Sequence, residues 1–375
     1  MAIDTDPGTD PARIVLHGEG QPLRWRRFLA TFAATALGLG LALYAWLLVV
    51  DGYDTVWFAP AFDREPVTSN QRFAFPALAR KDRFDSAIIG TSTTRLLRPR
   101  QLDALFDAHF VNLSMNDATA WEQAQIFRVF ARHHPAPRVV IFGIDAVWCE
   151  VGDDFRRLTP RPFPPWMYDE NRWNDLLNLF NLPAVEETGR QFGYLTGLRK
   201  PKYGKDGYTD FLPPDSAYDP ARARLRLYGP QGPQPRPAAI ARSPAAESAA
   251  EADAARLRFP MHPLLAGMLA SLPAGTVKIL MIVPYHIANQ PVSGSPAGLV
   301  WDECKRRLAA LAAVTPNAHV IDFMIESPLT TDDSHYWDRL HYTTSIATEL
   351  GEAMAEAVRR RRDHPGLYRY LGRSG

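Results

Sequence analysis

The sequence predicts an α/β protein with a five-stranded parallel sheet covered by helices on both faces, a long Pro-rich insertion and one N-terminal transmembrane helix. Short apolar runs of strand length alternate with amphipathic stretches from residue 85 onward, which is typical of a parallel sheet. Residues 28–50 carry no charge, and as a helix they extend for about 34 Å, enough to cross a bilayer core of about 30 Å. Many of the 32 prolines fall between residues 159 and 263, where regular structure is expected to be sparse.

The composition excludes several function classes. The 375 residues have a net charge of +1, so the chain lacks the basic excess of a nucleic-acid-binding protein. Its only cysteines, Cys149 and Cys304, are too few for a disulfide framework or a cysteine-built metal site. They form one bridge if the domain lies outside the cytosol, or they remain two separate buried thiols, and the sequence leaves both alternatives open.

The N-terminal region predicts a single-pass anchor with the N-terminus inside. Residues 1–27 form a polar cytoplasmic tail that ends in arginines, and residues 28–50 are the predicted transmembrane anchor. Asp51 and Asp54 follow the apolar run, so the positive-inside rule places the rest of the chain in the periplasm, outside the inner membrane. The run is longer than the apolar part of a typical signal peptide, which favours an anchor that is not cleaved. Residues 51–83 read as a connector.

The first half of the predicted α/β domain spans residues 84–146. Its strands are continuous apolar runs, as expected for strands that are covered on both faces. We expect strands at 85–89, 109–113 and 138–144, with helices at 101–108 and 118–133.

The pattern then breaks across the insertion, residues 147–276. A segment this long inside a compact domain predicts a lid, a small subdomain or a disordered excursion. Within it, a helix is expected near residues 173–180, and an Ala-rich segment after Pro230 favours another. Alternating arginines suggest one face of an edge strand or, by default, a solvated face; they are Arg222, Arg224 and Arg226.

The second half of the α/β domain spans residues 277–363 and is followed by a tail, 364–375. It contains two further predicted strands and two helices. Thr343 or Thr344 is expected to cap the closing helix, whose apolar residues recur along one face. We expect strands at 277–283 and 319–323, and helices at 301–313 and from residue 344 onward.

Three residues at opposite ends of this domain could perform acyl transfer by serine. Ser92 lies in the turn after the first strand, at the carboxyl edge of the sheet, where open α/β folds place their chemistry. Asp338 and His341 lie directly before the closing helix and supply an orienting carboxylate and a base. Asp332 and His335 repeat the same D-x-x-H spacing just upstream and remain the alternative pair.

A serine after the first strand and D-x-x-H before the last helix is the arrangement of the SGNH (GDSL-like) hydrolases, and the chain resembles this superfamily. It resembles more closely a membrane-anchored subgroup, the SGNH-like proteins of alginate and other exopolysaccharide O-acetylation and the D-alanyl transfer protein of teichoic acid. The shared features are a single anchor, an extracytoplasmic domain and a first block of the type G-[ST]-S-x-x-R. The matching blocks are Gly90 to Arg95, Asn112 to Glu122 and Asp338 to Tyr342.

The resemblance implies a flavodoxin-like SGNH sheet and a serine acyl-enzyme, with no cofactor and no metal ion. The expected activity is that of an O-acyltransferase or esterase acting on acyl (acetyl) esters of an envelope glycan or exopolysaccharide. A membrane-bound protein that donates acyl groups is the partner implied for transfer. Water and a sugar hydroxyl compete for the same acyl-enzyme, so the sequence leaves transfer and hydrolysis open.

The oxyanion hole departs from the superfamily pattern. Members usually offer a glycine amide after the second strand and an asparagine after the third, but this chain has no such glycine and carries Asp145 in the asparagine's place. Asn112 and Asn116 are the better candidate donors, although Asn112 could instead bond its own backbone. Arg95 either binds a substrate carboxylate or phosphate or pairs with an acid. The altered hole favours an alternative, a catalytically silent SGNH-like protein that binds glycan or scaffolds an envelope synthesis complex.

Overall fold

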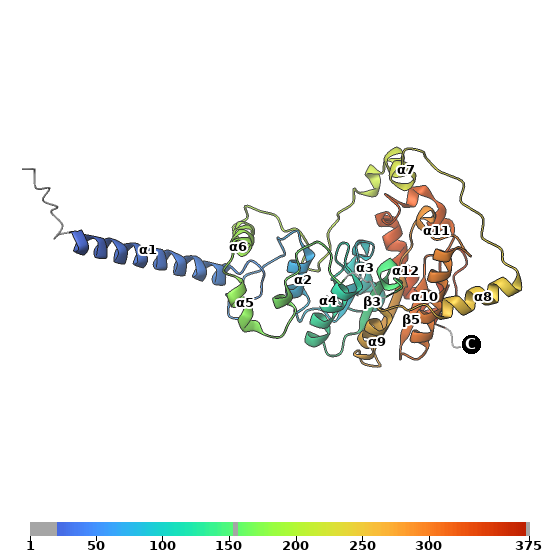
Figure 1. Cartoon of the computed structure of the whole chain (residues 1–375), viewed down its shortest axis with the longest axis horizontal. Helices are drawn as coiled ribbons and strands as arrows, with labels where there is room; N and C mark the ends of the chain where they lie inside the picture. The colour runs from blue at the N-terminus through green and yellow to red at the C-terminus, as the bar shows by residue number, and fades with distance from the viewer. Residues whose placement is uncertain (1–20, 153–156, 373–375) are drawn as a thin grey trace, which may run out of the picture.

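The computed structural model describes residues 21–152 and 157–372. Most of the predicted cytoplasmic tail, residues 1–20, and the last three residues of the predicted C-terminal tail lie outside the described residues. The described N-terminal part is one long helix, α1 (Gln21–Val50), which projects away from the rest of the molecule (Figure 1). Its segment Arg24–Val50 is long and apolar enough to span a membrane. The helix begins seven residues before the predicted start, because the arginines before Phe28 continue it.

The C-terminal end of α1 is fixed by polar contacts. Arg64 donates from Nε to the carbonyl oxygen of Val50 at 2.9 Å and from Nη2 to that of Val49 at 3.1 Å. These carbonyls have no partner within the helix, so the guanidinium satisfies them. The buried Asp51 carboxylate accepts from the amides of Thr55 and Val56 and turns the chain into the connector.

The sheet has six strands in the order β2-β1-β3-β4-β5-β6. The first five are parallel, and their order is that of flavodoxin-like doubly wound sheets. The sixth strand is a correction to the five predicted: a two-residue strand in the presumed tail pairs antiparallel with β5. The strands are β1 (Ser86–Ile89), β2 (Phe110–Asn112), β3 (Val139–Ile144), β4 (Val277–Ile282), β5 (Ala318–Asp322) and β6 (Arg369–Tyr370).

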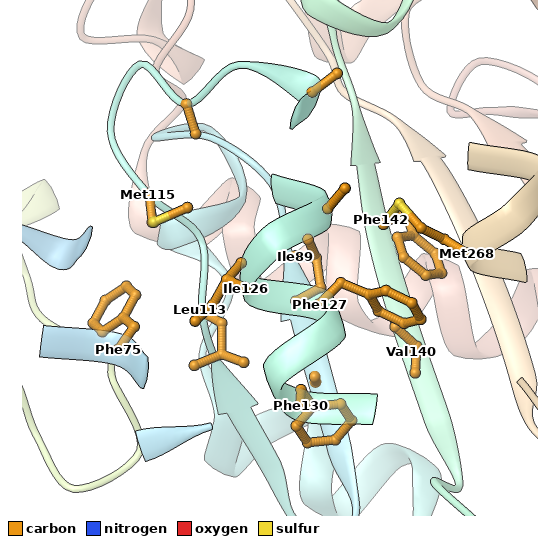
Figure 2. Packing of buried hydrophobic residues seen from close by; sticks show 14 of the residues in the cluster. Phe75, Ile89, Leu113, Met115, Ile126, Phe127, Phe130, Val140, Phe142 and Met268 are labelled. Atoms are coloured by element: carbon orange, nitrogen blue, oxygen red, sulfur yellow. The ribbon is translucent and has the colours of Figure 1, made fainter. Parts of the chain in front are cut away.

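Helices cover both faces of the sheet, as predicted. Side chains alternate along each strand: Ile88 faces one core, while Ala87 and Ile89 face the other. Figure 2 shows the second core, where Phe127 and Phe130 of one helix pack on Val140 and Phe142 of β3. The first core is covered by α3 (Pro99–Phe106) and α12 (Thr344–Arg360), and the second by α4 (Ala120–His133), α9 (His262–Ala270) and α10 (Pro296–Ala313).

The insertion is more regular than its proline content predicts. Its last helix, α9, is the crossover helix that two neighbouring parallel strands, β3 and β4, require. The expected helices near 173–180 and in the Ala-rich segment are present as α5 and α8. The arginines of 222–226 lie on helix α7 and not on an edge strand, because Asp219 caps that helix and Pro220 opens it. The helices before α9 are α5 (Arg172–Asn178), α6 (Leu182–Leu195), α7 (Pro220–Tyr228) and α8 (Pro244–Ala255).

Short helical turns complete the described chain. The connector contains one α-helix, α2, which Asn70 caps by accepting from the amide of Arg72. The remaining short elements are α2 (Gln71–Leu78), α11 (Pro328–Thr331) and the 3₁₀ turns η1 (Thr94–Leu96), η2 (Ala146–Trp148), η3 (Pro165–Met167), η4 (Asp215–Ala217), η5 (Ile287–Asn289) and η6 (Asp333–His335).

Of the two alternatives for the cysteines, the structure has the bridge: Cys149 and Cys304 form a disulfide with a Cα–Cα distance of 5.6 Å. Cys149 follows η2, just beyond the carboxyl end of β3, and Cys304 lies on α10. The bond therefore links the start of the insertion to a helix that follows its end.

Candidate active site

The turn that carries Ser92 is held tightly against the sheet. It leaves β1 through Gly90 and enters η1, whose Thr94 occupies the space that a side chain at position 90 or 143 would need. A Cβ added at Gly90 would lie 2.2 Å from Thr94 Oγ1, and one added at Gly143 of β3 would lie 2.4 Å from Thr94 Cγ2. The two glycines therefore let Thr94 pack between β1 and β3, which places Ser92 at the carboxyl edge of the sheet.

The Asp–His segment is a narrow turn before α12. Tyr336 and Tyr342 form an antiparallel bridge, and Trp337 donates its amide to the carbonyl of His341 at 2.8 Å. Asp338 Oδ1 accepts from the backbone amides of Leu340 and His341 at 2.8 and 2.9 Å. The buried Tyr342 hydroxyl donates to the carbonyl oxygen of Thr93 at 2.7 Å, so this turn is fastened directly to the serine turn.

The structure brings Ser92, His341 and Asp338 together. His341 Nε2 lies 2.8 Å from Ser92 Oγ, and His341 Nδ1 lies 2.8 Å from Asp338 Oδ2 and 3.0 Å from Oδ1. The side chains of His341 and Asp338 are 18% and 28% exposed, so the relay is accessible from solvent while its hydrogen bonds are partly shielded. Nucleophile, base and orienting carboxylate thus have the geometry that serine acyl transfer needs.

Asp338 is suited to remain ionised. Burial raises its pKa, but the hydrogen bond and charge of His341 and the two backbone amides outweigh burial, so the pKa of Asp338 lies below its ordinary value. A carboxylate that stays charged orients the imidazole and stabilises its protonated form.

The alternative pair, Asp332 and His335, points elsewhere. His335 Nδ1 contacts the carbonyl of Leu329 at 3.1 Å, and its Nε2 is 3.9 Å from Asp332. Asp332 accepts from the amide and hydroxyl of Ser334, which makes it the cap of η6. Ser92 therefore hydrogen-bonds to the other histidine.

Asn112 ends β2 and is buried, and both polar atoms of its side chain are hydrogen-bonded. Its Nδ2 donates to the carbonyl oxygens of Thr94 and Leu97 at 3.1 and 3.0 Å, and its Oδ1 accepts from the amide of Ser114. Both side-chain hydrogens therefore bond backbone, which leaves no donor for an oxyanion. This is the second of the two uses that the sequence left open.

Asn116 and Arg95 are placed together. Arg95 Nη1 donates to Asn116 Oδ1, so the amide oxygen of the asparagine faces the guanidinium. Met115, one residue earlier, donates its amide to the carbonyl of Gly90 at 3.0 Å, so the loop after β2 runs beside the serine turn. Within the described part of the chain, Asn116 Nδ2 and the amide of Ser92 donate to no protein group. Both are therefore candidate donors to an oxyanion.

A buried ion pair supports this loop from behind. Arg72 and Glu122 are both fully buried, with Nε–Oε1 and Nη2–Oε2 distances of 2.9 and 2.6 Å. Arg72 Nη1 also donates to the carbonyl of Asn116, and Glu122 accepts from the amide of Thr119 in a capping box. The paired charges thereby hold Asn116 in position, a role that the two residues' separation in sequence conceals.

Asp145 follows β3, and its buried surroundings disfavour the charged form of its carboxyl group. The carboxyl group is buried and accepts from the Thr91 hydroxyl and, at 3.3 Å, from the amide of Val147. Burial raises its pKa to about 6, against the opposing effect of these hydrogen bonds. Among the described residues, the Asp145 side chain contacts the serine turn through Thr91, the neighbour of Ser92.

The insertion forms one wall of the site. Phe211 packs edge-on against His341 at 5.7 Å, and the Arg95 guanidinium lies 4.4 Å from the centroid of its ring. Two further contacts fix this wall: Asn112 donates its amide to the carbonyl of Asp206, and Asp215 caps α12 by accepting from the amides of Thr344 and Ser345. Sequence reasoning missed Phe211, because an aromatic residue in a Pro-rich segment has no periodicity that would assign it to the site.

A polar groove of about 700 Å³ adjoins this wall. Arg98 Nε donates to the Tyr208 hydroxyl at 3.2 Å, and that hydroxyl donates to Asp210, the neighbour of Phe211. Arg100, His109 and Lys205 also line the groove. No cluster of three or more His, Cys, Asp or Glu side chains in residues 21–152 and 157–372 is arranged to hold a metal ion.

No protein-family model matches the chain, and no curated protein sequence matches it either.

Proposed function

We propose that the chain is a membrane-anchored serine O-acyltransferase or esterase of SGNH type, acting in the periplasm on acyl (acetyl) esters of an envelope glycan or exopolysaccharide. One observation carries the proposal: Ser92, His341 and Asp338 form a continuous hydrogen-bonded relay although serine and histidine are 249 residues apart. Such a relay activates a hydroxyl for acyl transfer, and a core residue that only packs would not need it.

In the proposed reaction, Ser92 Oγ attacks the ester carbonyl while its proton passes to His341 Nε2. Collapse of the tetrahedral intermediate breaks the ester C–O bond, and the imidazolium gives the proton to the departing alcohol. A sugar hydroxyl or water then attacks the acyl-serine, loses its proton to His341, and releases Ser92 reprotonated. Asp338 stabilises the imidazolium in both halves of the reaction.

The developing oxyanion would be held by the amide of Ser92 and the Nδ2 group of Asn116. Each such donor typically contributes about 3–4 kcal/mol to transition-state stabilisation. Arg95 orients the asparagine and brings a positive charge near the site, while Phe211 screens His341 from water. Partial exclusion of water favours transfer to a sugar hydroxyl over hydrolysis.

Two features support a periplasmic location. The disulfide Cys149–Cys304 suits an oxidising compartment and would be unusual in the cytosol. Arginines before the apolar part of α1 and aspartates after it favour an inner-membrane anchor with the N-terminus inside. An anchored enzyme stays close to a membrane-bound acyl-donor protein, and the polar groove beside Phe211 suits the acceptor glycan.

The test uses the full chain in detergent with p-nitrophenyl acetate, following acetyl-enzyme by intact mass spectrometry. We expect an acetyl adduct on the wild type, no adduct on Ser92→Ala, and a rate of nitrophenol release lower by roughly three orders of magnitude in His341→Ala. His335→Ala is the matched control, since this histidine contacts Leu329 and not Ser92, and it should keep full activity.

An adduct that forms without Ser92, or a loss of activity in His335→Ala with none in His341→Ala, would contradict the assignment. A second candidate function, a silent glycan-binding or scaffold protein, is favoured by one observation: Asn112 has no free side-chain donor and Asp145 replaces the usual asparagine. A wild type that forms no adduct yet binds acetylated glycan in calorimetry would support this second function.

A further inference from the structure

Large apolar side chains are exposed beside the C-terminal end of α1. They belong to the connector and to the α5–α6 hairpin of the insertion, and several are more than half exposed. Trp173 is 71% exposed, Leu177 79% and Leu182 70%. We call this set of exposed side chains the collar; its members are Trp57, Phe58, Trp173, Leu177, Phe180 and Leu182. So many exposed large apolar side chains in two segments beside one helix are unusual on a surface that meets only water.

The collar is joined rigidly to α1. Tyr44 donates its hydroxyl to the carbonyl of Leu176 at 3.0 Å, and its ring packs on Phe180 at 5.9 Å. A Cβ at Gly52 would lie 2.6 Å from the backbone nitrogen of Thr188 on α6, so only a glycine allows the chain leaving α1 to pack this closely. Helix and collar therefore move as one unit, and Figure 1 shows α5 and α6 flanking the end of α1.

Helix α6 crosses α1 instead of running along it. Phe180, just before α6, contacts Tyr44, and Phe192, in the last part of α6, contacts Trp46 at 6.3 Å. From Leu182, where α6 begins, to Phe192 the distance along the helix is about 15 Å, whereas Tyr44 and Trp46 are only about 3 Å apart along α1. If α1 stands along the membrane normal, α6 lies close to the membrane plane, the orientation of interfacial helices.

The depth of the contact also suits the interface. Tyr44 lies six residues before the end of α1 at Val50, which places the hairpin about 9 Å below that end. Interfacial helices bury their apolar face by about 5–10 Å at the boundary between headgroups and acyl chains. Beyond α6, Leu198 is 84% exposed and is followed by the exposed Arg199 and Lys200, which suit anionic headgroups.

We propose that the collar is a membrane-seating surface that embeds in the outer interface of the bilayer around α1 and holds the catalytic domain at a set height and orientation. The inference rests on the proposal that α1 spans the membrane, and it is independent of the chemistry at Ser92. An apolar groove of about 640 Å³ between α1 and α6, lined by Trp46, Val49, Phe62 and Phe192 among others, gives room for a lipid chain at this point.

The test is quenching of tryptophan fluorescence by lipids brominated on their acyl chains, using the full chain reconstituted in phosphatidylcholine–phosphatidylglycerol vesicles. Trp57 and Trp173 pack together at 5.0 Å and are replaced in one variant, Trp57→Phe/Trp173→Phe, which keeps apolar rings. We expect brominated lipid to quench a smaller share of the fluorescence in this variant than in wild type. Bromine at carbons 6 and 7 should quench the two tryptophans more than bromine at carbons 11 and 12.

Two variants separate the possible outcomes. Trp301→Phe, on α10 in the catalytic domain, should remove only fluorescence that lipid does not quench. Trp46→Phe reports on α1 itself and should remove quenchable fluorescence. If Trp46 is quenched but Trp57 and Trp173 are not, the anchor holds and the seating surface is overturned, as it would be if a protein partner covered the collar. If Trp46 is also unquenched, the transmembrane proposal fails as well.

Discussion

Asp145 is a buried carboxyl group next to the serine turn, and its ionisation should oppose folding. Its pKa is raised to about 6, so the folded state favours the protonated form. For an acid with a raised pKa, this stability is present at low pH and is lost as pH rises from the unfolded value near 4 to the folded value near 6. The shift of about two units corresponds to a loss on the order of 3 kcal/mol at pH 7.

We expect Asp145→Asn to remove this loss. The asparagine oxygen can still accept from the amide of Val147, and its NH₂ group can donate to the Thr91 hydroxyl. The unfolding free energy of the variant relative to wild type, measured by denaturant titration in detergent, should increase by about 3 kcal/mol between pH 4 and pH 7. Asp107→Asn, at an exposed position, is the control. A pH-independent difference between Asp145→Asn and wild type would refute the assignment.

At the residue scale, the sequence predicted which side chains of the candidate site meet, but it did not predict the contacts that support them. Ser92, Asp338 and His341 could be named because their spacing from strand and helix ends places them at one edge of a sheet. The use of Asn112 could not be decided, because an asparagine after a strand can bond backbone or substrate equally well. Arg72 and Glu122 carried no local signal, since their pairing depends on the packing of α2 against α4.

The serine turn is the element whose geometry is most sensitive to small changes. A Cβ at position 90 would collide with Thr94 Oγ1, so we expect Gly90→Ala to destabilise the chain by about 1–3 kcal/mol and to reduce the proposed esterase activity by displacing Ser92. The measurement is denaturant titration together with p-nitrophenyl acetate hydrolysis. Gly275→Ala, with nothing within 4 Å of the added carbon, is the matched control and should change neither.

A double variant tests whether the collision is the cause. Gly90→Ala/Thr94→Ala removes the clashing hydroxyl. The unfolding free energy of this double variant should therefore be higher than the sum of the two single effects predicts. If Gly90→Ala is as stable and active as Gly275→Ala, the turn is not constrained as described.

At the element scale, the sheet was easier to predict than the insertion. Continuous apolar runs mark buried parallel strands, so five strands were predicted within a few residues of their observed positions. Strand β6 is two residues long and has no pattern of its own, because it exists only by pairing with β5. Helix α7 could have been predicted from Asp219 and Pro220, whereas alternating arginines suggested an edge strand.

At the scale of the whole molecule, the disulfide adds a covalent link between the start of the insertion and α10. Cys149 and Cys304 are separated by 155 residues, and the loop between them contains α5 to α9 and β4. A covalent link across so long a loop restricts the unfolded chain strongly, and removing a native disulfide typically costs about 2–5 kcal/mol. Sequence alone could not decide whether the two cysteines meet, because that depends on how α10 packs beside the end of β3.

We therefore expect the Cys149→Ser/Cys304→Ser variant to unfold at lower denaturant concentration, with an unfolding free energy lower by about 2–5 kcal/mol. Wild type treated with dithiothreitol should show a loss of similar size, while the double variant should not respond to the reductant. The relay at Ser92 is built from other elements, so the folded variant should keep its esterase rate. If reductant affected wild type and the double variant equally, the bridge would not be what ties the insertion to α10.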